Sequence, residues 1–206
     1  MSGASSRAAK ISSIHSDVLK MPGARLVTSF SQVLGKELEM LKEMKHGGAC
    51  RALCIQWIIH RHQGKDFWSA MKDPNVFRQI INQQMSWDRG RKNFPNIKSH
   101  DEWIRLALST AELDIHSTDA VPTNPRIEIE HTYQFHIYRC VWAEKGAHAM
   151  AAEFRGPWVN FFDPNVGQFH FDSKTIYESF LNDVLFVKKK YGTKWTLYKL
   201  SKREIG

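Results

Sequence analysis

The side chain in this sequence with the clearest chemical potential is the thiol of Cys50. It follows the small residues Gly47, Gly48 and Ala49 and begins a segment, residues 49–59, that is apolar on nearly every face. Such a pattern predicts a helix buried inside a domain. At a helix N-terminus the unpaired backbone N–H groups and the helix dipole favour a thiolate over a thiol. Cys50 is therefore a candidate nucleophile near neutral pH.

A thiolate nucleophile needs a basic partner, and His148 is the candidate for this role. It lies in a run of small residues, 146–152, at the start of a predicted strand. Asp163 follows 15 residues later, at the end of the next predicted strand. Two antiparallel strands with a tight connection would place these two side chains together, and a carboxylate there would fix the imidazole tautomer. The spacing predicts a triad of Cys50, His148 and Asp163.

Two other interpretations involve the same helix. Cys54 is a rival nucleophile, but it lies one turn inside the helix and lacks the free terminal amides, so we expect a buried neighbour. Cys50 and Cys54 followed by His60 and His62 resemble a zinc-ligand spacing. Because successive helical residues turn by about 100°, these four side chains diverge on a continuous helix. We therefore expect no metal site and no cofactor.

Composition narrows the class of protein. The chain has 206 residues, and 42% of them are hydrophobic. This length and this hydrophobic content suffice for one domain with a hydrophobic core. Its three cysteines are too few for a disulfide scaffold, and no apolar run reaches the length of a membrane span. The net charge of +8 raises three partner classes: nucleic acid, an anionic membrane surface, or an acidic protein. The tryptophans lie in apolar patterns without interleaved Lys or Arg, which argues against nucleic acid.

The order of predicted elements indicates an α+β fold, with a helical layer packed on an antiparallel sheet. Residues 1–25 are rich in Ser and Ala and are predicted to be a flexible tail, with an export or targeting signal as the alternative. Residues 26–206 form the expected domain. Helices are predicted at 31–45, 49–59, 66–71, 76–87, 99–114 and 173–191, and strands at 25–30, 132–142, 147–154, 158–162, 168–171 and 195–200.

Three sequence fragments, in the expected order on the expected elements, give the chain a family resemblance. They are Gly48–Leu53 with Trp57 downstream, Gly146–Ala151, and Phe161–Gly167, which carries the pattern Phe-Asp-Pro-Asn-x-Gly. With these fragments the chain resembles the YopT/AvrPphB-type cysteine proteases, which are bacterial effectors delivered into host cells. The resemblance spans about residues 26 to 200.

The resemblance implies a papain-like fold in which Cys50 is the nucleophile, His148 the general base and Asp163 the orienting acid. It also implies secretion by a bacterium into the host cytoplasm, where the family cleaves host proteins. Rho-type GTPases and protein kinases are the substrate classes known for the family. The basic C-terminal region, which includes Lys188 and Lys194, would suit an anionic membrane face or a solvated surface.

One departure from the papain-like pattern concerns the oxyanion hole. These enzymes usually place Asn or Gln five or six residues before the nucleophile, where this chain has Lys45 and Met44. The backbone N–H of the nucleophile can supply one donor, and Lys45, His46 or Gln32 are candidates for the second. Losing one donor costs about 100- to 1000-fold in rate, so the departure concerns efficiency more than mechanism.

The function expected from the sequence is a cysteine endopeptidase that acts through a thioester acyl-enzyme. A deamidase or acyltransferase with the same triad is one alternative, because water or an amine can resolve a thioester. A catalytically weak basic binding module is the other, and the missing oxyanion side chain keeps it open.

Overall fold

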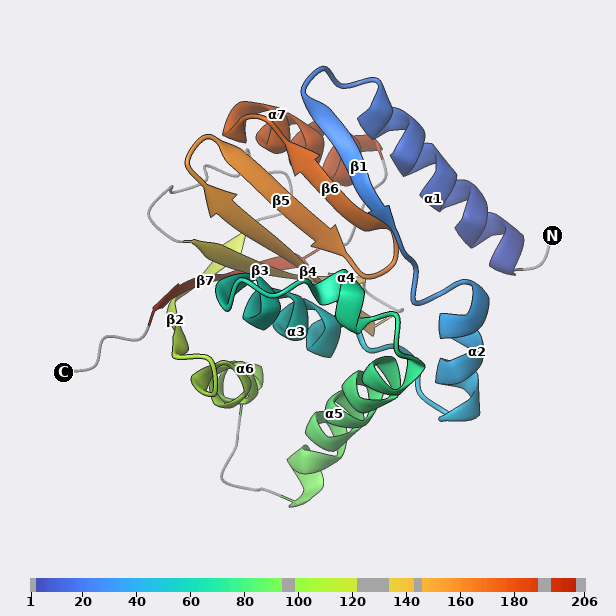
Figure 1. Cartoon of the computed structure of the whole chain (residues 1–206), viewed down its shortest axis with the longest axis vertical. Coiled ribbons are helices and arrows are strands. Elements are labelled where there is room, and N and C mark those ends of the chain that lie inside the picture. The colour runs from blue at the N-terminus through green and yellow to red at the C-terminus, as the bar shows by residue number, and fades with distance from the viewer. Residues whose placement is uncertain (1–2, 94–98, 122–133, 143–145, 189–193, 203–206) are drawn as a thin grey trace.

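The computed structural model of the chain describes residues 3–93, 99–121, 134–142, 146–188 and 194–202. Within these residues one antiparallel sheet forms the middle of the molecule and helices lie against both of its faces (Figure 1). The strands follow the order β1-β6-β5-β4-β3-β7-β2. Their bounds are β1 (Ala24–Ser29), β2 (Leu113–Val121), β3 (Phe135–Trp142), β4 (Gly146–Arg155), β5 (Trp158–Asp163), β6 (Gly167–Phe171) and β7 (Lys194–Lys202).

Helices between residues 35 and 109 lie on one face of this sheet, and among them α3 makes the main contact with it (Figure 1). The α+β fold expected from the sequence is confirmed. This face holds one hydrophobic core, in which Leu53 and Trp57 of α3 are fully buried and Trp57 stacks near Phe162 of β5. The helices are α2 (Gly35–Glu43), α3 (Cys50–His62), α4 (Phe67–Ala70), α5 (Pro74–Asn93) and α6 (His100–Ser109).

A second hydrophobic core fills the other face of the sheet. It is covered by α1 (Gly3–Leu19) and by α7 (Lys174–Ser179), which continues as a π-helical segment over Phe180–Lys188. Its aromatic part includes Phe161 and Phe180, whose ring centroids are 5.6 Å apart. The sheet is therefore enclosed by two helical layers, where the sequence suggested one.

Helix α1 corrects the flexible tail that the sequence suggested for residues 1–25. Ile11, Ile14 and Val18 recur at helical spacing and form an apolar stripe on an otherwise polar segment. Ile14 and Val18 are fully buried in the second core, and Ile11 packs against it. The Ser- and Ala-rich composition hid this stripe, because its three members are separated by polar residues.

The helix expected at 99–114 is also shorter than predicted. Its start is as expected, since Ser99 and Glu102 form a capping box, but it ends at Ser109. Glu112 then adopts a positive φ of 56°, and the chain continues as edge strand β2, paired with β7. The expected turn at 121–125 and the lysines at 189–190 lie largely outside the described residues.

A buried carboxylate joins α3 to β4 at the end of α3 away from Cys50. Glu153 is fully buried and accepts hydrogen bonds from Arg61 at 2.8 Å, Arg155 at 2.6 Å and Asn160 at 3.0 Å. A buried charge is tolerated when it is paired and hydrogen bonded in this way. The contact fixes the C-terminal end of α3 on the sheet.

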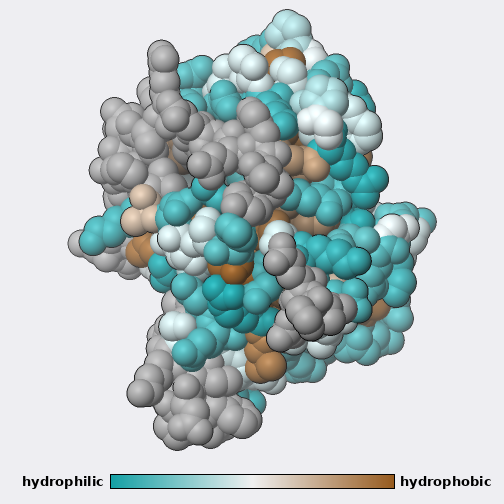
Figure 2. Space-filling model, turned by 90° about the vertical axis from the view of Figure 1, so that its left-hand side faces the viewer, coloured by the Kyte–Doolittle hydropathy of each residue, from teal (hydrophilic) through white to brown (hydrophobic). Residues whose placement is uncertain are grey.

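The surface seen in Figure 2 is mostly hydrophilic, and its hydrophobic residues form small separate patches. Among the residues that the structure describes, no helix combines the length and the apolar character needed to cross a bilayer.

Candidate active site

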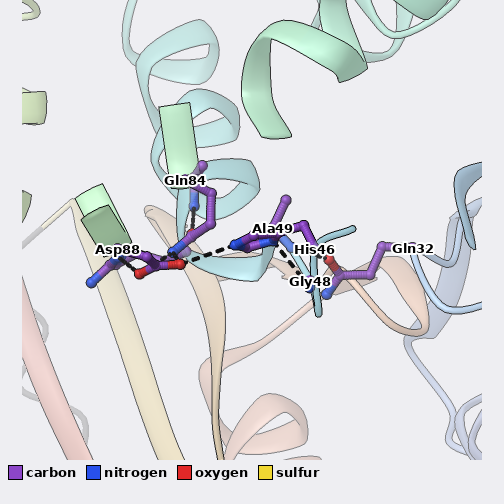
Figure 3. Close-up of polar contacts among 8 residues, drawn as sticks. Gln32, His46, Gly48, Ala49, Gln84 and Asp88 are labelled. Atoms are coloured by element: carbon purple, nitrogen blue, oxygen red, sulfur yellow. Dashed lines mark hydrogen bonds and ion pairs between the residues drawn. The ribbon is translucent and has the colours of Figure 1, made fainter. Parts of the chain in front are cut away.

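Cys50 is the first residue of α3, as the sequence predicted, and the loop before it is held from two sides (Figure 3). On one side, the Ala49 N–H donates to Oε1 of Gln32 at 2.7 Å. On the other, the Gly48 N–H donates to Nδ1 of His46 at 3.3 Å. Because these hydrogen bonds hold the two residues before Cys50, the position of Cys50 at the start of α3 is fixed.

The His46 side of this loop is anchored to α5. His46 Nε2 donates to Asp88 Oδ2 at 3.2 Å, and the same carboxylate accepts from Arg51 at 2.9 Å and from Gln84. Gln84 also accepts the backbone N–H of Ala52 at 3.1 Å. Figure 3 shows this chain of contacts running from α5 to the N-terminus of α3. No motif in the sequence indicated that Gln84 and Asp88 would support the loop.

His148 and Asp163 are brought together by the pairing of β4 with β5. Ala151 faces Phe162 in this pairing, so continuing the register places His148 diagonal to Asp163 on one face of the sheet. His148 Nε2 lies 2.7 Å from Asp163 Oδ1, and the two side chains are 4% and 1% exposed. The Asn165 N–H also donates to this carboxylate oxygen at 2.8 Å. The proximity predicted from the 15-residue spacing is therefore present.

The Cys50 thiol is hydrogen bonded to the His148 imidazole. Because Nε2 of His148 faces Asp163, Nδ1 is the ring nitrogen left for the thiol. Burial raises the pKa of Cys50, but the hydrogen bond and charge of His148, a backbone hydrogen bond from Ala149 and the charge of Arg51 bring it below its ordinary value. This environment favours a thiolate.

The pKa of His148 shifts in the opposite direction. Burial lowers it, but the charge and hydrogen bond of Asp163, together with the Cys50 thiol, raise it to about 10. A lowered thiol pKa beside a raised imidazole pKa describes a thiolate–imidazolium pair.

The other two thiols lie in different environments. Cys54 is fully buried, and burial followed by the charges of Cys50 and Asp163 raises its pKa well above the ordinary value. Cys140 is buried in β3 opposite His148, and its pKa is raised chiefly by burial. Neither lines the cavity that contains Cys50.

The zinc-like spacing on α3 does not produce convergent ligands. The helix is continuous from Cys50 to His62, so the side chains of the zinc-like spacing point in different directions around its axis. His60 packs against Phe67 instead. Across the described ranges, no group of three or more His, Cys, Asp or Glu side chains is placed to hold a metal ion.

Cys50 and His148 line a cavity of about 460 Å³. The candidate oxyanion donors differ in whether they also line this cavity. Lys45 is exposed and does not line it, whereas His46 lines it but both its ring nitrogens are already bonded. Gln32 is buried in the wall. Its Nε2 donates one hydrogen to Asn165 Oδ1 at 2.9 Å, and a second hydrogen remains on that amide nitrogen.

Asn165 and His15 support the turn that carries Asp163. Besides its backbone bond to Asp163, Asn165 contacts His148 Nδ1 through its side-chain nitrogen at 3.5 Å and accepts from Gln32. His15 of α1 bonds to the carbonyl of Val166 at 2.8 Å. The sequence motif contained Asn165 without indicating this role, and nothing in the sequence pointed to His15.

A cysteine at the start of a helix, packed on an antiparallel sheet that bears a His–Asp pair, is the arrangement of a papain-like cysteine protease. The model of the Peptidase C58 family, described as Yersinia/Haemophilus virulence surface antigen, matches residues 23–200. The chain belongs to this family, and it is a cysteine protease of the effector class that the sequence resemblance indicated.

Among solved structures, one shares the fold of this chain and another is a weaker match. The Pseudomonas avirulence protein AvrPphB is 14% identical, with a TM-score of 0.58 over 76% of this chain and 93% of that one. PatoxP, a cysteine protease-like domain of the Photorhabdus asymbiotica toxin PaTox, is 14% identical, with a TM-score of 0.47 over 97% of this chain and 60% of that one. None of the curated proteins compared matches the chain.

Proposed function

We propose that this cysteine protease is an endopeptidase that works through the triad of Cys50, His148 and Asp163. The observation that carries the proposal is the continuous hydrogen-bonded line from thiol to imidazole to carboxylate at the wall of a cavity. Two of the three groups are held by neighbouring strands and the third by a helix N-terminus. The relative positions of the three groups are thus set by the fold.

In the proposed acylation step, the Cys50 thiolate attacks the scissile carbonyl carbon and a carbon–sulfur bond forms. As the tetrahedral intermediate collapses, the carbon–nitrogen bond breaks and the His148 imidazolium gives its proton to the leaving amine. The new chain end departs and a thioester remains on Cys50. His148, now neutral, removes a proton from water, which attacks the thioester and releases the second product. Asp163 holds the imidazole orientation and stabilises its charged form.

The oxyanion of each tetrahedral intermediate needs hydrogen-bond donors. We assign one to the backbone N–H of Cys50, which belongs to the first turn of α3 and has no partner within the helix. We assign the other to the second Nε2 hydrogen of Gln32, which lines the same cavity. This donor, from the loop after β1, would stand in for the Asn or Gln missing before Cys50, and it argues against the alternative of a catalytically weak binding module.

For the substrate, we infer a protein of the host cell, because the family is one of virulence effectors. A Rho-type GTPase or a protein kinase is the proposed substrate class, and delivery into the host cytoplasm is the proposed route. We also propose attraction to an anionic membrane surface, which the net charge of +8 supports.

The experiment that tests the triad maps the reactive thiol. The protein is treated with limiting iodoacetamide and the adduct is located by mass spectrometry, while proteolysis of a host-cell lysate is followed by the appearance of new peptide termini. We expect the adduct on Cys50 and no new termini with the Cys50→Ser variant. Cys54→Ser is the matched control and should retain cleavage. An adduct confined to Cys54 or Cys140, or cleavage that survives Cys50→Ser, would contradict the assignment.

A further inference from the structure

The cavity at Cys50 extends beyond the groups used in catalysis. Its other end is lined by Ile104 of α6, by Ile137 and Arg139 of β3 and by Tyr198 of β7. Ile104, Ile137 and Tyr198 are buried, whereas Arg139 is half-buried. None of these four residues takes part in the proposed mechanism. The end of the cavity that they line is therefore available for substrate binding.

The sheet register places Arg139 close to the reacting groups. In the pairing of β3 with β4, Arg139 lies opposite Ala149, the residue after His148. Directly opposed residues of antiparallel strands have Cα atoms about 4.5–5.5 Å apart. Ala149 also supplies the backbone hydrogen bond to Cys50. A guanidinium at this position is within reach of substrate residues next to the scissile bond.

Of the Arg, His and Asp side chains that line the cavity in the described part of the chain, all but Arg139 have an ion-pair partner. Arg51 is paired with Asp88 at 2.9 Å and lies 5.2 Å from the centroid of the Trp87 ring. The Asp88 carboxylate is shared with His46. In contrast, Arg139 has neither an ion pair nor a side-chain hydrogen bond within the part of the chain that the structure describes. A partly desolvated cation of this kind is stabilised by any carboxylate that reaches it.

The carboxylate of Asp101, which lies beside Tyr198, already has hydrogen-bond partners. Asp101 is hydrogen bonded to the Tyr198 hydroxyl and lies 3.5 Å from the hydroxyl of Thr118. Burial, and then the charge and hydrogen bond of Asp101, raise the pKa of Tyr198 to about 12, so the phenol stays neutral at physiological pH. Tyr198 therefore adds no negative charge that would balance Arg139.

We propose that this end of the cavity is a substrate subsite in which Arg139 binds the side chain of an Asp or Glu within two residues of the scissile bond. The proposal rests on the proposed function and adds a substrate preference to it. The planar guanidinium can bind a carboxylate through two parallel hydrogen bonds. Ile104 and Ile137 would contact the methylene groups of the same substrate side chain.

The experiment compares cleavage of one peptide library, prepared from a host proteome, by the wild-type protein and by Arg139→Gln, Arg139→Glu and Arg7→Glu. Arg7 is an exposed residue of α1 outside the cavity, so Arg7→Glu matches the charge change of Arg139→Glu. The melting temperature and the rate of Cys50 alkylation by iodoacetamide are measured for each variant. They establish that the variants fold and keep a reactive thiol.

We expect the wild-type and Arg7→Glu proteins to select Asp or Glu at one position within two residues of the cleaved bond. Arg139→Gln should lower kcat/KM for the best acidic peptide by about 10- to 100-fold, and Arg139→Glu should shift the preference at that position to Lys or Arg. Wild-type cleavage without acidic selection, or an unchanged preference in a folded Arg139→Glu, would overturn the subsite. If the wild-type protein cleaves no peptide although Cys50 is alkylated, the endopeptidase function itself fails.

Discussion

Gln32 lies 17 residues before Ala49 in the sequence, yet its side-chain amide contacts Ala49, the residue that precedes the proposed nucleophile. A search confined to positions close to Cys50 finds Lys45 and Met44 and predicts an incomplete oxyanion hole. Gln32 is the proposed replacement, and it lies near the site because the loop after β1 runs beside the Asp163 turn, where the backbone N–H of Gln32 donates to the Pro164 carbonyl at 2.8 Å. This role depends on tertiary structure, and a local motif cannot show it.

Replacing Gln32 with Glu distinguishes two roles of the side chain, accepting a hydrogen bond from the Ala49 N–H and donating one to the oxyanion. The variant keeps an oxygen that can accept from Ala49 but loses the donor, and its charge repels an oxyanion. We expect kcat to fall by about 100- to 1000-fold with little change in KM, while alkylation of Cys50, which forms no oxyanion, continues. The matched control is Gln83→Glu, a half-buried glutamine bonded to Gln56 outside the cavity. Equal activity in the two variants would remove Gln32 from the oxyanion hole.

The coupled titration of Cys50 and His148 predicts the pH dependence of activity. The lowered pKa of the Cys50 thiol extends the thiolate to lower pH than in an ordinary cysteine, and activity should fall as acid protonates it. The raised pKa of His148, about 10, means that activity should also fall as the pH rises through that value and the proton is lost. The measurement is kcat/KM against pH, whose two limbs belong to the pair.

Replacing Asp163 with Asn provides a check on the alkaline limb. Loss of the carboxylate charge lowers the pKa of His148, so the limb should move to lower pH. Asp172→Asn is the control, because Asp172 contacts Arg25 and His170, away from the cavity. An alkaline limb at the same pH in both variants would show that Asp163 does not set the titration of His148.

Among the elements, α1 is the part of the fold that the sequence concealed. Residues 3–19 precede the family match at residue 23, but the helix buries Ile14 and bonds through His15 to the turn that carries Asp163. Propensity and composition described the polar majority of this segment correctly. They gave too little weight to three apolar residues that acquire a partner only when the sheet is assembled.

Truncation of the Ile14 side chain tests the contribution of α1 to stability. We expect Ile14→Ala to lower the free energy of unfolding by about 3 kcal/mol, since the side chain is 1% exposed and its removal leaves a cavity. Arg7→Ala on the exposed side of the same helix should change it by less than about 0.5 kcal/mol. Urea denaturation of both variants measures the difference. Equal midpoints would mean that α1 is not part of the cooperative unit.

Local patterns predicted some elements well and others poorly, for a common physical reason. The start of α3 and the hairpin between Asp163 and Gly167 follow from turn residues and apolar spacing, which act within a few residues. The helix expected at 99–114 overlaps only the first two residues of strand β2, and no strand is expected over the rest, because β2 depends on pairing with β7, more than 70 residues later. The place of β1 beside β6 likewise follows from a long-range contact, as does the role of Gln32.

For the molecule as a whole, the net charge of +8 is a property whose function the sequence alone does not reveal. One lysine of β7 is not free to contact a membrane, since Lys199 is paired with Asp119 at 2.9 Å and its side chain is only 10% exposed. The neighbouring residues Lys194 and Lys202 are exposed. On the face that Figure 2 shows, the described hydrophobic residues form only small patches, so we expect attraction of this face to a membrane to be mainly electrostatic.

Electrostatic attraction of this kind predicts salt-sensitive binding. We expect sedimentation with phosphatidylserine-containing vesicles at low ionic strength and release as salt shortens the screening length. The double variant Lys194→Glu and Lys202→Glu should bind less than the control Lys36→Glu and Lys65→Glu. Equal binding of the two double variants would exclude the β7 face as the contact surface.

The Glu153 contact has a mechanical consequence for the active site. Arg61 fastens the far end of α3 to β4, and the near end carries Cys50 against His148 of the same strand. An axial slip of α3 by one residue would displace the thiol by about 1.5 Å. The ion pair, about 16 Å away along the helix axis, acts as an anchor against that slip. We therefore expect the Arg61–Glu153 ion pair to help keep Cys50 and His148, the proposed nucleophile and base, in alignment.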